Sequence, residues 1–506
     1  MLKRKLKKVL LFKLTLSTSF FYAQKQTPDV KIQNAFGQLD YLSVKMPKNE
    51  INMDFSGIHY NLKMNDWSYA GVGIYGAIGG KRGGFFTLGV NAGIQKTITN
   101  HFFIDTGVHF GGGGGASAPD GGGAFILPHF NLGYNFKNFS TTAGYSYINF
   151  FDKGLIKSSQ FNIALQIPLS FKHTSFEDLE KTYTYSDLSS TSWNTDSSKN
   201  ALFIHFNNMD VTQGNYKGKI IRLAGFEYNS YINNNFFYFV RADGAYQGIK
   251  AGYMDVFVGA GYHFGMNRNR TNLLAKFAIG AGGGGGVDTQ GGFLMYPDIS
   301  LEQKIFKNVY ISVDKGFILS PNRHFVSSSF GFGVKYYVDK NGTKSEKSTF
   351  SLGKFKGIET IIKHEVYVNA QRDQGFEKNM HQISFQINFF LNRYLYAAGQ
   401  TSFANFGDAG AYGEGIIGLG IKSNRFFNKS TYIFTQILAG AAGGGGISTG
   451  QGLIVKPSLG IDLKLNEDLN FRAAVGHSKA IAGSLSSSFF NLGISYNFSF
   501  LSMKKE

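Results

Sequence analysis

The chain has 506 residues, of which 65 are Gly, 8 are Pro and none is Cys. Such a glycine content is far outside that of an ordinary globular enzyme, and the lack of Cys excludes disulfides, thiolate metal sites and a lipidated cysteine. Aromatic residues make up 16% and charged residues 17% of the chain, and the formal net charge is +18. The apolar residues must therefore be hidden by alternation with polar ones, because long apolar runs are lacking.

The first 23 residues have the pattern of a secretory signal peptide. Five basic residues between positions 3 and 8 precede an apolar stretch from Val9, and the small residue Ala23 ends the segment. The alternative, a short basic membrane anchor, is disfavoured because the stretch is much shorter than the ~20 residues of a spanning helix. We predict that 1–23 is removed on export. Without its six basic residues, the net charge falls from +18 to about +12, which favours anionic partners.

After this segment the sequence contains three copies of the same passage. Each copy contains a glycine-rich loop, and these loops run from Gly111 to Gly115, from Gly282 to Gly286 and from Gly443 to Gly446. A Pro follows each run, and then a strand that begins at Phe161, Phe330 or Phe490. The Pro residues, at 128, 297 and 457, are 169 and 160 residues apart, and so are the three Phe residues. A constant period across several anchors indicates triplication.

The repeats and the polar stretches between them divide the chain. In chain order we predict the signal peptide at 1–23, barrel repeat 1 at 24–171, a polar linker at 172–200, barrel repeat 2 at 201–338, a second polar linker at 339–356, barrel repeat 3 at 357–500 and a charged tail at 501–506. Each repeat contains about eight runs of alternating residues, mostly 10 to 16 residues long. Such strands exceed the usual length in soluble sheets and suit a tilted crossing of a membrane.

Alternation along these strands separates an apolar face from a small or polar one. The last strand shows it most clearly, since Phe490, Leu492 and Ile494 alternate with Asn491, Gly493 and Ser495. This period of two is that of a strand with one buried or lipid-facing side. The residues that we predict to face lipid are Val90, Phe161, Ile163, Leu165, Ile167, Phe330, Phe332, Phe490, Leu492, Ile494 and Phe498.

The connections between strands also alternate. Every second one is short and rich in Asn, as at Asn65-Asp66, Thr99-Asn100 and Asn233-Asn234, whereas most of the others are longer and contain Gly, Ser or Lys. Short turns on one rim and longer loops on the other are typical of bacterial outer-membrane barrels. The chain thus resembles Gram-negative outer-membrane β-barrel proteins as a class, in its leader, its strands and its aromatic last strand. The resemblance implies an all-β fold, a transmembrane antiparallel β-barrel located in the outer membrane.

Two architectures fit three repeats of about eight strands: three linked small barrels, or one barrel of about 24 strands. The polar linkers favour three barrels, because a single barrel would need tight turns there. The inward-facing Gly, Ala, Ser, Thr, Asn, Gln and Tyr residues favour them too, since a small barrel is filled by side chains. We would expect many charges in a wide, water-filled lumen.

No pattern in the chain indicates catalysis, a cofactor or a metal site. The glycine runs lack the Lys-Ser/Thr of a phosphate-binding loop, and Gly71-Val72-Gly73-Ile74-Tyr75-Gly76 has no helix after it. Aligning the glycine runs places Asp105 opposite Lys276 and Gln436, so inward chemistry is not repeated. His477-Ser478 lacks any hydrolase motif. We predict that the protein is not an enzyme and that the glycines serve curved strands and loops.

Three functions remain compatible with the sequence. The first is a structural, adhesive or ligand-binding role through the extracellular loops, the second is a large-lumen porin or outer-membrane transporter, and the third is an outer-membrane hydrolase. The expected partners are outer-membrane lipids with lipopolysaccharide, the barrel-assembly machinery and an anionic ligand at the basic outer loops, which include Lys81, Arg82, Lys153 and Lys157. No nucleic acid is expected.

Overall fold

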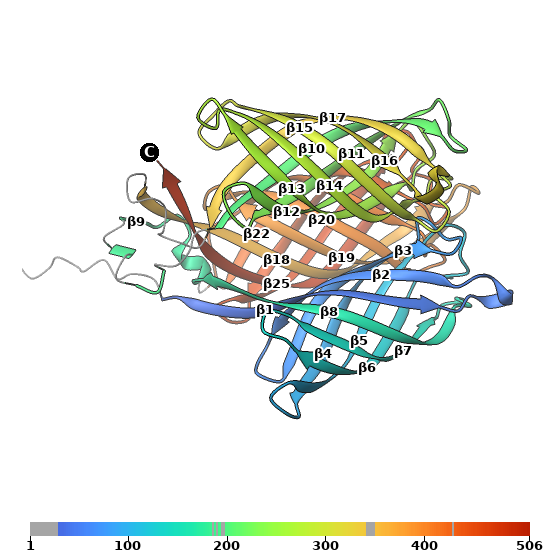
Figure 1. The fold of residues 1–506 in the computed structure, drawn as a ribbon, viewed down its shortest axis with the longest axis horizontal. Coiled ribbons are helices and arrows are strands. Elements are labelled where there is room, and N and C mark those ends of the chain that lie inside the picture. The colour runs from blue at the N-terminus through green and yellow to red at the C-terminus, as the bar shows by residue number, and fades with distance from the viewer. Residues whose placement is uncertain are drawn as a thin grey trace, which may run out of the picture.

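Within the described residues, alternating strands close into three separate eight-stranded antiparallel barrels (Figure 1). The computed structural model describes residues 29–184, 187–188, 191–193, 198–340, 350–427 and 430–505. The predicted signal peptide at 1–23 lies outside them. No helix in the described part of the chain is long and apolar enough to span a membrane.

The strands follow one another in chain order around each barrel. Barrel 1 consists of β1 (Lys31–Val44), β2 (Met53–Lys63), β3 (Ser68–Gly79), β4 (Phe86–Thr97), β5 (Phe102–Gly114), β6 (Phe125–Asn135), β7 (Ser140–Phe150) and β8 (Lys157–His173). Barrel 2 consists of β10 (Ser198–Gln213), β11 (Ile220–Tyr231), β12 (Phe236–Gln247), β13 (Met254–Met266), β14 (Thr271–Gly283), β15 (Phe293–Lys304), β16 (Val309–Leu319) and β17 (Val326–Lys340). Barrel 3 consists of β18 (Phe350–Gln371), β19 (Glu377–Phe390), β20 (Leu395–Phe406), β21 (Gly413–Lys422), β22 (Thr431–Gly443), β23 (Leu453–Lys464), β24 (Leu469–Ala480) and β25 (Ser486–Lys505).

Each barrel closes by pairing its first strand with its last. The register sets Leu39 opposite Leu165 in barrel 1, Phe206 opposite Phe332 in barrel 2 and Ile362 opposite Ile494 in barrel 3. A single barrel of about 24 strands, the other architecture that the sequence allowed, is therefore wrong. Shorter elements complete the chain: the 3-10 turns η1 (Pro47–Asn49), η2 (Phe176–Asp178) and η3 (Pro321–Arg323), and the strand β9 (Thr182–Thr184).

The strands extend beyond the predicted ends of the repeats. β18 begins at Phe350 and β25 ends at Lys505, so part of the second predicted linker and most of the predicted charged tail form strand. The two ends pair with each other, with Phe355 opposite Leu501. Both side chains are fully buried, which explains why this ribbon forms despite the lysines around it.

The segment between barrels 1 and 2 packs against this ribbon. β9 adds to β18 with Tyr183 opposite Gly353, and the Trp193 ring centroid lies 5.1 Å from that of Phe355. Trp193 is fully buried in a cluster that includes Leu188. The stretch 172–200 is therefore more than a polar spacer, because its few large apolar residues anchor it to barrel 3.

The two rims of each barrel differ, as the alternating connections predict. One rim has short turns, such as 64–67, 232–235 and 465–468, and the other has longer loops, such as 115–124, 284–292 and 444–452. Asn side chains shape several short turns: Asn65 Oδ1 accepts hydrogen bonds from the backbone N–H groups of Trp67 and Ser68 at 3.0 and 2.8 Å. Asn233, Asn392 and Asn466 do the same. A short polar side chain that caps its own turn explains the preference for Asn there.

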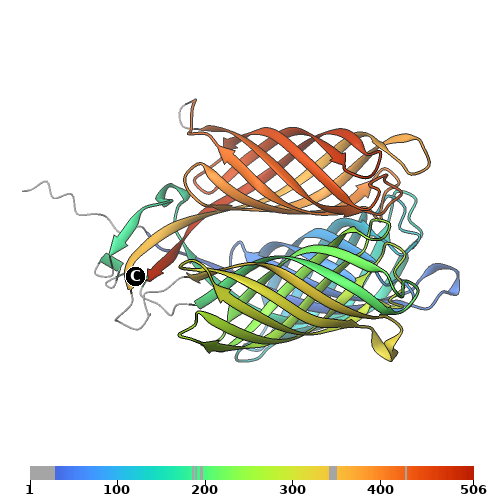
Figure 2. The same ribbon diagram turned by 90° about the horizontal axis from the view of Figure 1, so that it is seen from above.

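The three barrels lie side by side with their axes roughly parallel (Figures 1 and 2). β3 contacts β14, β12 contacts β22 and β20 contacts β5, so the third strand of each barrel meets the fifth strand of another. The same relation repeated three times returns to its start, as in a cyclic trimer. The fold is thus a pseudo-threefold trimer made from one chain.

An apolar cluster fills the space where the three barrels meet. Phe86 and Leu88 from barrel 1, Val256 from barrel 2, and Phe403 from barrel 3 are buried together there. Phe86 and Leu88 belong to the outward row that continues to Val90, which is only half-buried. The outward face of a strand therefore serves two environments, because part of it packs against a neighbouring barrel.

The glycine runs allow backbones of different barrels to come close together. A Cβ added to Gly84 would lie 2.2 Å from the backbone N of Gly284, and one added to Gly443 would lie 2.7 Å from that of Gly252. At the third interface, a Cβ on Gly112 would lie 2.5 Å from the Ala404 carbonyl oxygen. Only glycine permits this approach. The runs thus join barrels, a role beyond the strand curvature that we expected.

The predicted outward residues lie mostly on the free surface of the barrels. Phe161 and Phe332 are 56% and 50% exposed, and Ile494 is 52% exposed. The exposed set also contains Ile163, Ile167, Phe330, Phe490 and Leu492, and Leu165 is half-buried. Phe498 departs from the prediction with 6% exposure, because its ring packs 5.2 Å from that of Phe171 of barrel 1.

Candidate functional site

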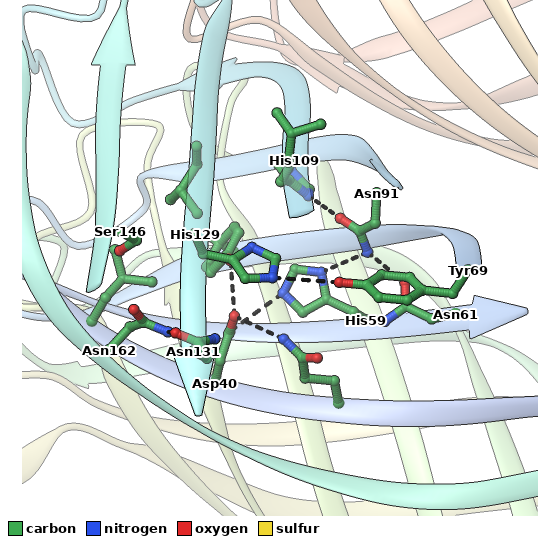
Figure 3. Close-up of a pocket in the computed structure, with 15 residues that line it drawn as sticks. Asp40, His59, Asn61, Tyr69, Asn91, His109, His129, Asn131, Ser146 and Asn162 are labelled. Carbon is green, nitrogen blue, oxygen red and sulfur yellow. Dashed lines mark hydrogen bonds and ion pairs between the residues drawn. The ribbon is translucent and has the colours of Figure 1, made fainter. Parts of the chain in front are cut away.

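The interior of barrel 1 holds a chain of hydrogen-bonded polar side chains (Figure 3). Tyr75 donates to Asp40 Oδ2 at 2.8 Å, and Asp40 Oδ1 lies 3.3 Å from His59 Nε2. The other ring nitrogen of His59 is 3.1 Å from the amide nitrogen of Asn91, whose oxygen contacts His109. These residues come from β1 to β5, so closure of the barrel brings them together.

A second polar cluster in barrel 1 surrounds Asp105. Tyr69 donates to Asp105 Oδ1 at 2.9 Å, and Gln166 donates to Oδ2 at 2.8 Å. His129 Nε2 lies 3.5 Å from Oδ1. The carboxylate thus has partners from β3, β6 and β8 around the whole barrel, and it ties them together.

The space left in barrel 1 is small. Its cavity measures about 20 Å³, which is room for about one water. Small inward residues make space for the rings, since a Cβ on Gly73 would lie 1.8 Å from His59 Nδ1 and one on Gly89 would lie 2.3 Å from His109 Nε2. Gly71 and Gly73 therefore serve interior packing on β3, whereas a Cβ on Gly76 would lie 2.7 Å from the Ala281 Cβ of barrel 2. No helix follows them.

Barrel 2 is filled by ion pairs. Lys276 Nζ lies 3.0 Å from Glu227 Oε2 and 2.9 Å from Asp298 Oδ2. Arg241 Nε lies 2.6 Å from Asp243 Oδ2. Lys335 pairs with Glu302 at 2.6 Å, and His205 contacts Asp243 at 2.6 Å. The exposed fraction of these side chains is at most 2%.

Barrel 3 is filled in the same way by other residues. Lys422 lies 2.8 Å from both Glu359 Oε1 and Asp462 Oδ2, and Arg472 lies 3.3 Å from each of the same two carboxylates. A second group joins Lys456 to Glu414 at 2.9 Å, and Lys456 also contacts Glu365. These side chains are at most 2% exposed.

The charged interiors correct one expectation from the sequence. We expected small and polar inward residues in narrow barrels and charges only in a wide lumen, yet barrels 2 and 3 are narrow and highly charged. Most of these buried charges lie beside an opposite one, which is the condition for burying them, whereas Asp255 accepts a hydrogen bond from the Tyr253 hydroxyl at 3.0 Å. A water-filled lumen would leave these groups accessible, and their near-zero exposure means that side chains fill both interiors. The signal was present at inward positions such as Glu227, Lys276 and Lys335.

Two of the four predicted basic loop residues are paired with acids. Arg82 binds Glu50 with two hydrogen bonds of 2.6 and 2.8 Å, and Lys153 lies 3.0 Å from Asp408 of barrel 3. Lys81 instead lines a cavity of about 430 Å³ where the three barrels meet on the long-loop rim. The predicted glycine runs begin at the ends of β5, β14 and β22, and the last two runs continue into the loops that line this cavity.

The His477-Ser478 pair does not form a joint site. His477 is on the outside of β24 and lies 2.9 Å from Ser486 Oγ, whereas the Ser478 side chain is fully buried in the barrel. Adjacent residues of a strand point to opposite faces. Within the described residues, no cluster of three or more metal-ligating side chains occurs.

Taken together, the fold is that of a triple β-barrel protein with packed interiors and a shared long-loop rim. No protein-family model and no curated protein matches the chain. Similar solved structures are outer-membrane β-barrel proteins, the class that the sequence resembles. A mutant of the ferric enterobactin receptor PfeA from Pseudomonas aeruginosa is 9% identical, with 92% of this chain and 80% of that chain covered and a TM-score of 0.27.

Two further structures have the same level of similarity. The copper transporter OprC is 8% identical, with coverage of 94% and 81% and a TM-score of 0.30. OpdQ from Pseudomonas aeruginosa is 7% identical, with coverage of 93% and 98% and a TM-score of 0.21. At these scores no detail is transferred from them, and the fold assignment rests on the three closed sheets.

Proposed function

We propose that the protein is a non-conducting outer-membrane anchor that presents three sets of long loops as one extracellular surface, with a structural, adhesive or ligand-binding role. The observation that carries this proposal is the combination of apolar outer faces with interiors filled by side chains. Exposed rows such as Phe330, Phe332 and Val334 suit hydrocarbon. The side chains of the interior ion pairs in barrels 2 and 3 are at most 3% exposed, which supports closed interiors.

The orientation follows from the two rims. In bacterial barrels the short turns are periplasmic and the long loops extracellular. The rim that carries the loops 115–124, 284–292 and 444–452 then faces outwards, where the outer barrel surface meets lipopolysaccharide. The barrel-assembly machinery is the expected partner for β25, whose extension to Lys505 distinguishes it from a strand with an aromatic end. The proposal assigns no catalytic step to the chain.

Single cysteines test the location and orientation, because the chain has none of its own. Lys217 lies in the long-loop connection 214–219 and Lys307 in the short turn 305–308 of the same barrel, and both side chains are exposed. In intact cells a membrane-impermeant maleimide should label Lys217→Cys and leave Lys307→Cys unlabelled until the outer membrane is opened. Equal labelling of both, or recovery of the protein in a soluble fraction, would reject the proposal.

A further inference from the structure

One opening of the long-loop rim lies between the barrels and not within one. Its volume of about 430 Å³ is within the range of small-molecule sites, about 300–1,000 Å³. All three barrels line it: Lys81 and Ser117 from barrel 1, Lys250 and Asp288 from barrel 2, and Asp373 and Thr449 from barrel 3. A site made in this way exists only when the three repeats are assembled.

Three equivalent tight turns surround this cavity. In each, the fourth residue donates a backbone hydrogen bond to the carbonyl of the first, and the bonds run from Ala118 to Gly115, from Val287 to Gly284 and from Ile447 to Gly444, at 2.9, 3.0 and 3.1 Å. The two central residues of every turn have φ between 49° and 82°, the sign pattern of a type I′ turn. Glycine occupies both central positions in barrels 2 and 3.

In the turns of barrels 2 and 3, the carbonyl groups of the two central residues accept hydrogen bonds, but their N–H groups have no acceptor in the described chain. Their central carbonyls accept hydrogen bonds, Gly285 from Tyr216 at 3.2 Å, Gly286 from Asn215 at 2.7 Å, Gly445 from Arg372 at 3.4 Å and Gly446 from the Asp373 N–H at 2.9 Å. The N–H groups of the same four glycines donate to no atom of the described chain. These N–H groups, on residues that line the cavity, are therefore available to an acceptor.

One cation of the lining has no acidic partner among the described residues. Asp373 lies 3.0 Å from Lys250, and Asp288 lies 2.9 Å from His324, which is charged only when it is protonated. Lys81 is in no ion pair with any described residue. Free backbone N–H groups next to an unmatched ammonium group are the usual elements of an anion site.

A buried hydroxyl gives a second, independent indication. Thr449 lines the cavity with 1% exposure, and its Oγ1 has no hydrogen-bond partner among the described residues. An unpaired buried polar atom costs stability. A hydroxylated ligand would supply the missing bond.

We propose that this cavity binds the phosphate or carboxylate group of a hydroxylated small molecule, such as an acidic sugar. Lys81 contacts the anionic group, the turn N–H groups share it, and Thr449 bonds to a hydroxyl. The biological meaning rests on the proposed function, which places this rim outside the cell. Binding itself does not depend on orientation and is measurable on the folded protein in detergent.

Calorimetry with glucose 6-phosphate, and with glucose as the neutral control, tests the proposal on the full-length protein. Glucose 6-phosphate should bind saturably and glucose should not. Lys81→Ala should weaken binding about tenfold or more, the usual effect of losing a charge-assisted hydrogen bond, and Thr449→Val should weaken it severalfold. Lys217→Ala, the same charge change on the same rim but away from the cavity, should leave affinity within about twofold.

Two results would overturn the proposal. The first is the absence of saturable binding of glucose 6-phosphate or galacturonate at millimolar concentrations by protein whose gel mobility shows intact barrels. The second is an equal loss in the Lys81→Ala and Lys217→Ala variants, which would mean general attraction to a basic surface. The cysteine labelling in cells is a separate readout, so a failure of the binding site is distinguishable from a failure of the membrane assignment.

Discussion

Replacement of Lys276 by Met removes the central cation of barrel 2. The ammonium group lies 3.0 Å from Glu227 and 2.9 Å from Asp298, and all three side chains are fully buried. After the change, the nearest cations to Glu227 are Arg241 and Lys335, both at 3.9 Å. Breaking a buried pair by removing one partner costs about 3–5 kcal/mol, and the two remaining cations favour the lower part of that range.

Urea titration of the protein in lipid vesicles measures this cost. Gels run without heating separate folded from unfolded protein by mobility. This readout does not depend on tryptophan fluorescence, so it applies to all three barrels. The midpoint of Lys276→Met should fall by an amount equivalent to about 3 kcal/mol. Lys307→Met, at an exposed turn of the same barrel, should stay within about 0.5 kcal/mol of the wild type.

A triple variant separates the loss of pairing from the loss of packing. If Glu227→Gln and Asp298→Asn are added to Lys276→Met, both acids that Lys276 paired with are removed, and a large part of the stability should return. An unchanged midpoint in Lys276→Met would refute the view that this network holds barrel 2 together. The same conclusion would follow if the triple variant were no more stable than Lys276→Met alone.

Three further changes test other parts of the structure. Gly84→Val should destabilise the contact between barrels 1 and 2 by at least about 1–3 kcal/mol, because its Cβ would meet Gly284. Gly218→Val has a similar positive φ and nothing within 4 Å, so it should cost only the backbone strain. Equal urea midpoints of the two variants would argue against the interface. Leu165→Arg should lower the free energy of unfolding by about 2–4 kcal/mol and reduce assembly into vesicles. Leu165→Met should change the free energy of unfolding by less than about 1.5 kcal/mol. Equal assembly of the two variants would contradict a lipid-facing position. Burial raises the pKa of Asp120 in the loop 115–124 to about 7. The folded loop therefore favours the protonated carboxyl group. The resulting stabilisation of the folded loop is present below pH 4 and should be lost as the pH rises through 7. Hydrogen exchange of this loop, corrected for intrinsic rates, should show the loss, and Asp120→Asn should abolish its pH dependence.

Much of the fold could be predicted from the sequence because strand alternation is a local property. The period of two in Phe161 to Ile167 and in Phe490 to Ile494 indicated the outward rows, and the Asn-rich turns indicated the two rims. The repeated glycine runs indicated the threefold organisation. Each of these signals lies within a few residues, or within one repeat, so no knowledge of distant contacts was needed.

The contacts between barrels could not be read in this way. Phe86, Leu88 and Phe498 continue apolar rows that look lipid-facing, and only the packing of the barrels shows that they are buried against a neighbour. The glycine runs indicated curved strands and loops, whereas they also permit backbone contact between barrels. The central cavity depends on all three repeats, so no single stretch of sequence could indicate it.

The ion networks were missed for a different reason. Glu227, Lys276 and Asp298 lie on three different strands, and each one alone looks out of place inside a narrow barrel. The role of these three residues becomes clear only when the closed sheet brings opposite charges within hydrogen-bond distance. Inward charges of both signs in one repeat therefore indicate a packed interior. A narrow barrel need not be filled by small and polar residues alone.

Planar-bilayer recording of the purified full-length protein tests the central claim most directly. Three barrels with interiors filled by buried side chains should insert without producing a stable open level in the nanosiemens range, at either polarity. A reproducible nanosiemens pore from protein with intact gel mobility would contradict the packed interiors and, with them, the assignment of a non-conducting anchor.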